Sequence, residues 1–320
     1  MRRFPALIAV LGLAAAVLVG CSSSPTASSC QAPADTDPAT MGLITVTGSA
    51  DATPAVSVRT PFHTSTTQFK TVTKGTGDVP ITRDSQLLVL DLTLSDGTTG
   101  RPLVKTSYDG DLSRVYPVSQ WTKTIGLTGV RAALQCATAG ARIAVALAPK
   151  DVHADTLQGL GVSTDDSLIA VLDVRKVYLP AANGALVYNQ GWGLPDVVRA
   201  PDGRPGVVVP DGPAPKNMTV QVLKRGSGQV VNGDAPVRVH ETVVNWTDKT
   251  VASTTWDSTP VSLTLSSQPK GVQDALKGQT VGSQIMAIIP PADDTSGAQD
   301  TQIYVFDILG IDAPGTTATQ

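Results

Sequence analysis

Glutamate is almost absent from this chain. Glu241 is the only one among 320 residues, and aromatic side chains make up only 4% of the sequence. Aspartate, threonine, valine and glycine are abundant instead, and these residues favour strands and turns over helices. The formal net charge is −3, and no basic stripe runs along the sequence. Because nucleic-acid binding needs concentrated positive charge, the composition argues against it and predicts a β-rich protein.

The chain also lacks the motifs that hold metals and cofactors. Its three cysteines do not have metal-ligand spacing, and His63 and His153 have no partners at catalytic or metal spacing. The Gly-x-Gly turns do not open the helix of a βαβ unit, which argues against a phosphate loop. No Gly-x-Ser-x-Gly elbow supports a Ser-His-Asp hydrolase. We therefore expect no metal and no cofactor, and we place both histidines on the surface.

Hydrophobic runs long enough to cross a membrane are missing. The apolar run at residues 6–19 follows Arg2 and Arg3, and it is shorter than the about 20 residues that a spanning helix needs. It has the form of a signal peptide and ends Leu-Val-Gly-Cys at Cys21, which resembles a bacterial lipobox. The alternative is an ordinary secretory signal with an incidental cysteine. The lipobox predicts a signal peptide at residues 1–20 and a lipid on Cys21.

The segment after Cys21 has almost no large apolar residue. It is rich in serine, alanine, proline and aspartate, so we expect a flexible tether over residues 21–43. The protein would then lie outside the cytoplasm, held on the cell membrane by its lipid. In that compartment Cys30 and Cys136 either form a disulfide or remain free thiols, with Cys136 a small buried residue.

Two stretches of the chain match each other. Residues 129–140 and 271–282 both read G-V-x-x-A-L-x-x-x-x-x-G, and they lie a domain's length apart. In each, a valine, an alanine and a leucine at positions i, i+3 and i+4 share one helical face. Short apolar runs bounded by turn residues surround them, as in antiparallel sheets. These runs lie at 86–94, 142–148, 167–177, 237–244, 284–289 and 302–311. The pattern predicts an α+β protein of two copies, each a curved sheet over one short helix.

The second copy carries an ordered series of motifs. A Lys-x-Gly-x-Gly turn at 224–228 leads to Gly-Asp, Val-x-Val-His, Trp-Asp-Ser, the helix from residue 271, Ile-Pro-Pro and Val-Phe-Asp-Ile-Leu-Gly-Ile. This series resembles an FKBP-type peptidyl-prolyl cis-trans isomerase, and the whole chain resembles tandem FKBP lipoproteins of actinobacteria. The resemblance implies an antiparallel β half-barrel around one helix in each copy. It places the copies at residues 44–180 and 215–314, with a linker and leading strand at 181–214 and a tail at 315–320.

The resemblance also implies a proline pocket in the second copy. Trp256, Asp257 and Phe306 take the positions of the family's catalytic side chains. Glu241, Val261 and Val272 take positions that line the pocket, where the family has a tyrosine, a phenylalanine and a tryptophan. The tyrosine that follows Ile-Pro-Pro in the family is missing from residues 292–297. A valine floor and a charged wall predict a weakened pocket.

The first copy departs further from the family. Lys105 stands where the aspartate is expected, Asp91 at the tyrosine, Val130 at the pocket floor and Leu172 at the last aromatic. We therefore expect no isomerase activity from it.

Plainer interpretations of the same residues remain. Trp256 and Phe306 are also consistent with ordinary core aromatics, Asp257 with a turn residue, and His240 with a structural role.

The sequence leaves three functions open. The first is a lipid-anchored isomerase that helps exported, proline-containing polypeptides fold, as a monomer and with its activity in the second copy. The second is a chaperone or peptide-binding lipoprotein that uses the same fold without catalysis. The third is a structural lipoprotein with no client.

Overall fold

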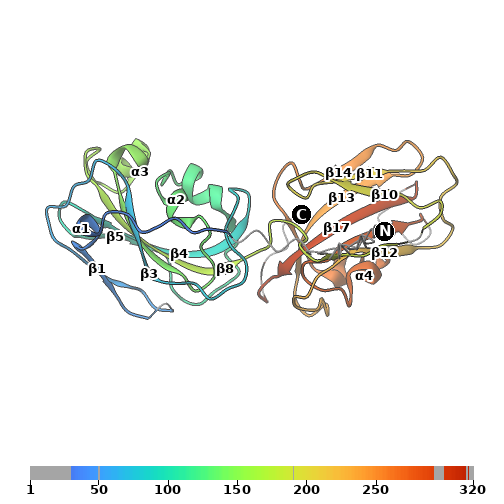
Figure 1. Ribbon diagram of the computed structural model, residues 1–320, viewed down its shortest axis with the longest axis horizontal. Helices are drawn as coiled ribbons and strands as arrows, with labels where there is room; N and C mark the ends of the chain where they lie inside the picture. The colour runs from blue at the N-terminus through green and yellow to red at the C-terminus, as the bar shows by residue number, and fades with distance from the viewer. Residues whose placement is uncertain (1–29, 50, 190, 292–298, 315, 317–320) are drawn as a thin grey trace, which may run out of the picture.

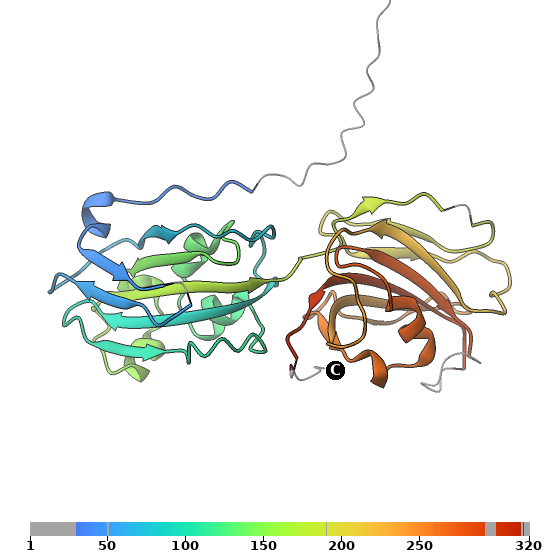
Figure 2. The same cartoon turned by 90° about the horizontal axis from the view of Figure 1, so that it is seen from below.

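The computed structural model describes residues 30–49, 51–189, 191–291, 299–314 and 316. The predicted signal peptide, Cys21, the segment after Ile-Pro-Pro and most of the expected tail lie outside the described residues. We use "first unit" for residues 30–180 and "second unit" for residues 181–314. Figures 1 and 2 show the two units side by side along the long axis, joined where one strand leaves the first unit.

The molecule is rich in sheet and has few helices, as the composition predicts. In the first unit the strands are β1 Ile44–Thr47, β2 Ala55–Val58, β3 Gln68–Thr73, β4 Leu87–Asp96, β5 Pro102–Lys105, β6 Tyr116–Pro117, β7 Arg142–Leu147 and β8 Leu168–Val177. Its helices are α1 Pro38–Met41, α2 Val130–Leu134 and α3 Ala154–Gly159, with short non-α turns at Gln120–Thr124 and Pro149–Asp151.

In the second unit the strands are β9 Ala185–Leu186, β10 Asp196–Arg199, β11 Pro205–Val208, β12 Thr219–Arg225, β13 Val237–Asn245, β14 Val251–Thr254, β15 Val261–Leu263, β16 Gln284–Ile289 and β17 Gln302–Ile311. One α-helix, α4 Lys270–Leu276, and a 3-10 turn at Leu265–Ser267 complete it. The six strands predicted from apolar runs agree with β4, β7, β8, β13, β16 and β17 to within about two residues at each end.

The two units repeat one sheet topology. The first sheet runs β3-β7-β8-β4-β5, with β6 paired to β4. The second contains the same order, β12-β16-β17-β13-β14, with β15 paired to β13 and β9 added at the edge. All of these pairings are antiparallel. The duplication inferred from twelve matched residues therefore extends over the whole sheet.

Each sheet packs its short helix on one face, which we call the helix-side face. Val130, Ala133 and Leu134 of α2 are buried against β7 and β8, as their spacing predicts. Val272, Ala275 and Leu276 of α4 are buried in the same way against β16 and β17. The first unit differs from the expected single helix, because the connection from β7 to β8 holds the additional helix α3.

A β-hairpin covers the opposite face of each sheet, which we call the hairpin-side face. The β1–β2 hairpin packs on Ala144, Ala146 and Ile169 in the first unit. In the second unit the β10–β11 hairpin and its flanks pack on alternate residues of β13, β16 and β17. Residues 181–214 are thus a folded part of the second unit, where the sequence predicts a linker with a leading strand. Each strand of these hairpins is only four residues long, which is why the sequence analysis missed them.

The expected tether is also partly folded. A disulfide joins Cys30 to Cys136, which confirms the disulfide alternative over two free thiols. Beyond it, the Thr36 amide donates to the Phe69 carbonyl at 3.0 Å, and Met41 is 1% exposed beneath β1. We call residues 30–36 the strap. A polar sequence can be held without a core of its own when covalent and backbone bonds attach it to an existing sheet.

The junction between the units is made by the residues that follow β8. The Tyr178 hydroxyl donates to Asp312 Oδ1 at 2.7 Å, and the Leu179 amide donates to the Leu309 carbonyl at 3.1 Å. Both side chains are buried. From the first unit, Arg83 Nη1 donates to the Asp202 carbonyl at 2.6 Å. The segment expected to join the copies loosely is therefore bonded to the end of β17.

None of the helices within the described residues is long and apolar enough to span a bilayer.

Candidate functional site

Four of the six residues expected in the pocket meet on the helix-side face of the second unit. Phe306 is fully buried and Val272 is 3% exposed, and both belong to the core under α4. Val261 is half-buried and packs against the same core. Glu241 pairs with Phe306 across β13 and β17, so their side chains lie on the same face. This group, Glu241, Val261, Val272 and Phe306, is the candidate site.

An additional aromatic residue belongs to this site. Tyr304 lies two residues before Phe306 on β17, and the two rings stack with centroids 5.5 Å apart and an interplanar angle of 12°. The Tyr304 hydroxyl donates to Gln302 Oε1 at 2.7 Å. The sequence analysis did not select Tyr304. The two-residue period of a strand could have found it, because residues i and i+2 share a face.

Trp256 lies on the opposite face of the sheet from Phe306. Its indole stacks on the imidazole of His240, with centroids 4.2 Å apart. His240 pairs with Asp307, so it faces the hairpin side, whereas Glu241 and Phe306 face the helix side. A Cβ added at Gly203 would come within 3.3 Å of the Trp256 ring, so the turn of the β10–β11 hairpin approaches it closely.

Asp257 also contacts the turn of the β10–β11 hairpin. Its carboxylate accepts two hydrogen bonds from Arg204, at 2.5 and 3.0 Å, and its side chain is largely exposed. The guanidinium of Arg204 holds the pKa of Asp257 below its usual range. The structure therefore does not bring Trp256 and Asp257 to Phe306. They attach the turn at residues 200–204 to the sheet.

Equivalent hydrogen bonds correct the alignment of the two copies. Thr255 Oγ1 contacts His240 Nδ1 and accepts from the Glu241 amide. In the first unit Thr106 Oγ1 donates to Asp91 and accepts from the Leu92 amide. Asp91 therefore matches His240, and Leu92 matches Glu241.

The expectation that Asp91 stands at the tyrosine position is consequently wrong by one residue. Lys105 likewise matches Thr254, because it pairs with Thr93 as Thr254 pairs with Thr242. The register shifts fall at equivalent residues, between Val89 and Leu90 in the first unit and between Arg238 and Val239 in the second, so the strand pairings give the correspondence that sequence distance alone missed.

The candidate site is strongly apolar in the first unit. Leu92 is 5% exposed and Leu172 is 1% exposed, and both lie in the core with Val130. Aliphatic side chains thus fill the positions that Glu241, Phe306 and Val272 occupy in the second unit. The expectation that Leu172 replaces the last aromatic is consistent with its pairing to Leu92, as Phe306 pairs with Glu241.

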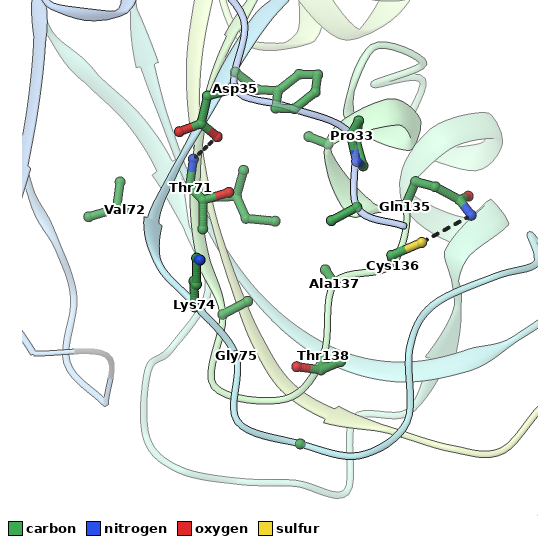
Figure 3. A pocket seen from close by; sticks show the side chains of 16 residues that line it. Pro33, Asp35, Thr71, Val72, Lys74, Gly75, Gln135, Cys136, Ala137 and Thr138 are labelled. Carbon is green, nitrogen blue, oxygen red and sulfur yellow. Dashed lines mark hydrogen bonds between the residues drawn. The ribbon is translucent and has the colours of Figure 1, made fainter. Parts of the chain in front are cut away.

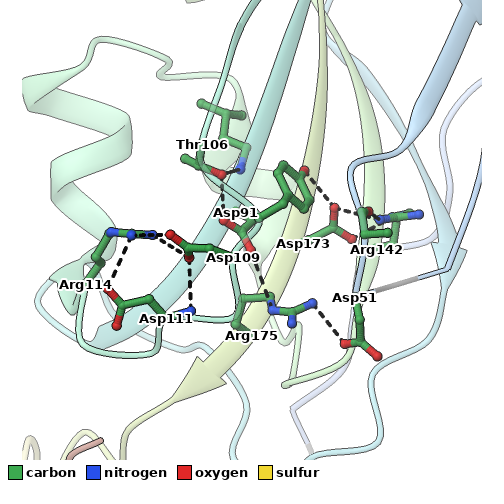
Figure 4. Close-up of polar contacts among 12 residues, drawn as sticks. Asp51, Asp91, Thr106, Asp109, Asp111, Arg114, Arg142, Asp173 and Arg175 are labelled. Carbon is green, nitrogen blue, oxygen red and sulfur yellow. Dashed lines mark hydrogen bonds and ion pairs between the residues drawn. The ribbon is translucent and has the colours of Figure 1, made fainter. Parts of the chain in front are cut away.

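The hairpin-side face of the first unit carries a buried polar network instead (Figure 4). Arg142 donates two hydrogen bonds to Asp173, at 2.6 and 3.0 Å, and both side chains are almost fully buried. Its remaining donors reach the Gly48 and Ala52 carbonyls in the β1–β2 turn. The Tyr108 hydroxyl donates to Asp173 at 2.9 Å. This network fastens the leading hairpin to the sheet, so its role is structural.

A cavity of about 760 Å³ lies under the strap of the first unit (Figure 3). Asp35 from the strap, Lys74 and Gly75 after β3, and Gln135 and Thr138 after α2 line it. The Asp35 carboxylate accepts from the Thr71 amide at 2.8 Å, which holds the strap at this rim. A Cβ on Gly75 would lie 2.3 Å from Thr138 Oγ1, so the glycine permits close packing. The segment is not a hairpin turn, because β3 pairs with β7 and not with β4, the strand that follows it.

Titration of His240 gives a testable consequence for stability. Burial, and then the positive charge of Arg83, lower its pKa from 6.5 to about 4. As pH falls below 6.5, the unfolded chain takes up a proton on His240 that the folded chain does not. The free energy of unfolding is therefore unaffected by this group above pH 6.5 and decreases as pH falls toward 4. The shift corresponds to about 3 kcal/mol. Urea unfolding of the wild type and of His240→Gln between pH 7.5 and 4.5 measures it.

We expect His240→Gln to be less stable at pH 7.5 but to depend less on pH than the wild type. Burial raises the pKa of Glu241 and of Asp307, and these groups act in the opposite sense, which is why the comparison with the variant is required. Equal pH dependence in both proteins would contradict the assignment to His240.

Comparisons with known proteins find FKBP-type isomerases among solved structures. No family model matches the chain, and no curated protein matches it. FkpA from Escherichia coli has a TM-score of 0.28 and 18% identity over 36% of this chain and 51% of its own, about half its length. The three FKBP domains of wheat FKBP73 have a TM-score of 0.30 and 14% identity, and the match covers 77% of this chain and 94% of theirs. A protein described as a putative FKBP12 from Mycobacterium tuberculosis has a TM-score of 0.26 and 21% identity, and the match covers 30% of this chain and 86% of its own. These likenesses are too low to assign a role to any residue.

Proposed function

We propose that this chain is an FKBP-type peptidyl-prolyl cis-trans isomerase that acts on exported polypeptides, with its activity in the second unit. A lipid on Cys21 holds it at the outer side of the cell membrane as a monomer, and proline-containing segments of unfolded proteins are its clients. The proposal rests on one observation above the others. On the helix-side face, the buried rings of Phe306 and Tyr304 stack in the core with Val272, and Val261 is half-buried beside them, which places an aromatic pair where the resemblance puts the proline pocket.

Prolyl isomerisation needs an apolar aromatic surface rather than a nucleophile or a metal. The peptide bond rotates over a barrier of about 18–20 kcal/mol, and an X-Pro bond takes tens to hundreds of seconds unaided. The twisted amide loses resonance and is less polar than either planar form. A site that excludes water therefore binds the twisted form better, and this difference in binding lowers the barrier. The first unit has no aromatic residue at the equivalents of Phe306, so it contributes no activity.

Replacement of Phe306 by leucine tests the proposal. Leucine occupies the equivalent position in the first unit, at Leu172, so the fold accommodates it. We expect the acceleration of isomerisation to fall about tenfold, because the aromatic surface that favours the twisted amide is lost. The measurement is the rate of a proline-limited peptide with the full mature chain. The thermal transition of the variant shows whether the second unit remains folded.

Two results would change the proposal. A wild-type rate equal to that of buffer would remove the isomerase activity altogether. A loss in Asp257→Asn as large as that in Phe306→Leu would return the hairpin-side pair, Trp256 and Asp257, to the catalytic site.

Binding without catalysis is the second candidate. It is favoured by the charged Glu241 on the apolar face and by the position of Trp256 and Asp257 on the other face. A chain that suppresses the aggregation of an unfolded client, yet does not accelerate isomerisation, would support this candidate.

A further inference from the structure

The first sheet has an edge strand that is open over part of its length. β3 ends the strand order β3-β7-β8-β4-β5, so only one of its two edges is paired within the sheet. On its other edge, the strap bonds to Phe69 and to the Thr71 amide. Among the described residues, no strand or hydrogen bond covers residues 72–74 from that side. Residues 71–74 are all exposed, and an unpaired edge of this kind is a template for another strand.

The equivalent edge of the second unit is covered. The bulge of β12 falls at the same place as the bulge of β3, so residues 222–225 correspond to residues 71–74. There β9 pairs antiparallel with the end of this stretch, and the Leu223 carbonyl accepts from the Val187 amide at 3.0 Å. An extended segment of polypeptide therefore fits this edge of the fold, and the bulge does not prevent it from pairing.

The path of the strap accounts for the difference between the units. Residues 185–189 precede the β10–β11 hairpin as the strap precedes the β1–β2 hairpin, but the strap leaves its edge strand at Asp35. Its other end is joined through Cys30 to Cys136, which follows α2, so the strap crosses the cavity and does not continue along β3. The cavity of about 760 Å³ thus lies beside the uncovered residues, where a further strand would run (Figure 3).

The cavity offers side-chain contacts as well as an open backbone edge. Its volume is in the range of clefts that hold ligands. Ala133, Ala137 and Ile143 contribute an apolar lining, on which every second side chain of an extended segment could pack. Lys74 also lines the cavity, and none of the described residues forms an ion pair with it. An acidic side chain would complement this charge.

We propose that residues 71–74 bind an extended segment of a client polypeptide as an added antiparallel strand, and that an aspartate or glutamate of the segment pairs with Lys74. In this mode of recognition, main-chain hydrogen bonds to an open edge supply the affinity and side chains supply the selectivity. The site lies in the first unit, from which we expect no isomerase activity. It therefore goes beyond the proposed isomerase function, because it holds a client chain without reference to proline.

The test uses the full mature chain and three peptides that contain no proline. The first is Ser-Val-Thr-Val-Asp-Val-Ser, the second has asparagine in place of aspartate, and the third is the first with N-methyl groups on its three central residues. Fluorescence anisotropy measures affinity. We expect the first peptide to bind about threefold more tightly than the second, because an exposed ion pair contributes little. The third should bind at least about tenfold more weakly than the first, because backbone hydrogen bonds are lost.

Reversal of one charge identifies the side chain that selects the peptide. We expect Lys74→Glu to bind the asparagine peptide more tightly than the aspartate peptide. Arg225→Glu is the matched control, because Arg225 stands at the equivalent position on the edge that β9 already covers. It should keep the wild-type preference. Hydrogen exchange locates the added strand: the first peptide should increase the protection of the amides at residues 71–74 and leave those of β12 unchanged.

Several outcomes would overturn the proposal. These are an N-methylated peptide that binds as tightly as the first, equal binding of the aspartate and asparagine peptides by the wild type, a preference for aspartate that persists in Lys74→Glu, and an equal change in Arg225→Glu. Sedimentation that shows a dimer, with protection of residues 71–74 that is lost on dilution, would assign the edge to a second copy of the chain. Because the peptides contain no proline, none of these results bears on the isomerase function.

Discussion

Replacement of Cys30 and Cys136 by serine is expected to lower the free energy of unfolding of the first unit by about 3–5 kcal/mol. The disulfide joins residues 106 positions apart, and a cross-link over such a loop restricts the unfolded chain strongly. It also fixes the strap at the rim of the cavity, where hydrogen bonds of Asp35 and Thr36 to β3 hold its other end. Denaturant unfolding of the wild type and of the double serine variant measures the difference.

Reductant provides the control for this prediction. Dithiothreitol should destabilise the wild type by a similar amount and leave the double variant unchanged. Hydrogen exchange should locate the loss in β3 and α2, while the amides of β12 and α4 keep their protection, because the second unit lacks the cross-link. A wild type that is insensitive to reductant, or a loss spread equally over both units, would contradict the assignment.

Replacement of Asp173 by alanine is expected to destabilise the first unit by about 3–5 kcal/mol. The change leaves the Arg142 guanidinium buried without its carboxylate, and removal of one partner from a buried pair costs more than removal of both. Tyr108 also loses its acceptor. The measurement is again denaturant unfolding, with near-ultraviolet circular dichroism to confirm that the remaining fold is intact.

The chain offers two matched variants for this pair. Asp109→Ala breaks the exposed pair with Arg114, and we expect little measurable change, because solvent screens that contact. Arg142→Gln copies the second unit, where Gln284 donates to the buried Asp307. It should cost less than Asp173→Ala, since no cation is left uncompensated. A loss in Asp109→Ala as large as that in Asp173→Ala would refute the role of burial.

The sequence alone indicated most of the sheet and both repeated helices. Apolar runs predicted six long strands, and the i, i+3, i+4 spacing predicted the buried faces of α2 and α4. These features are local, since each depends on a period or on a backbone constraint within a few residues.

Sequence reasoning failed for the faces of the central strands. All ten residues of β4 are buried, and β13 is nearly as covered, because a hairpin packs on one face and a helix on the other. A strand that is buried on both faces has no alternation to show which residues share a side. A shift of one residue then exchanges the faces, and this is how Asp91 came to be matched with Glu241 in place of Leu92.

The sequence by itself determined that the chain is a β-rich duplication with one short helix on each sheet, because those properties follow from composition and periodicity. Only the tertiary structure decided what the candidate site contains. It separated Trp256 and Asp257 from Phe306, brought Tyr304 to Phe306, and left Glu241 alone among apolar side chains. The reason is physical: which face a side chain occupies depends on bulges and on the hairpins that cover each sheet, and these contacts join residues far apart in the sequence.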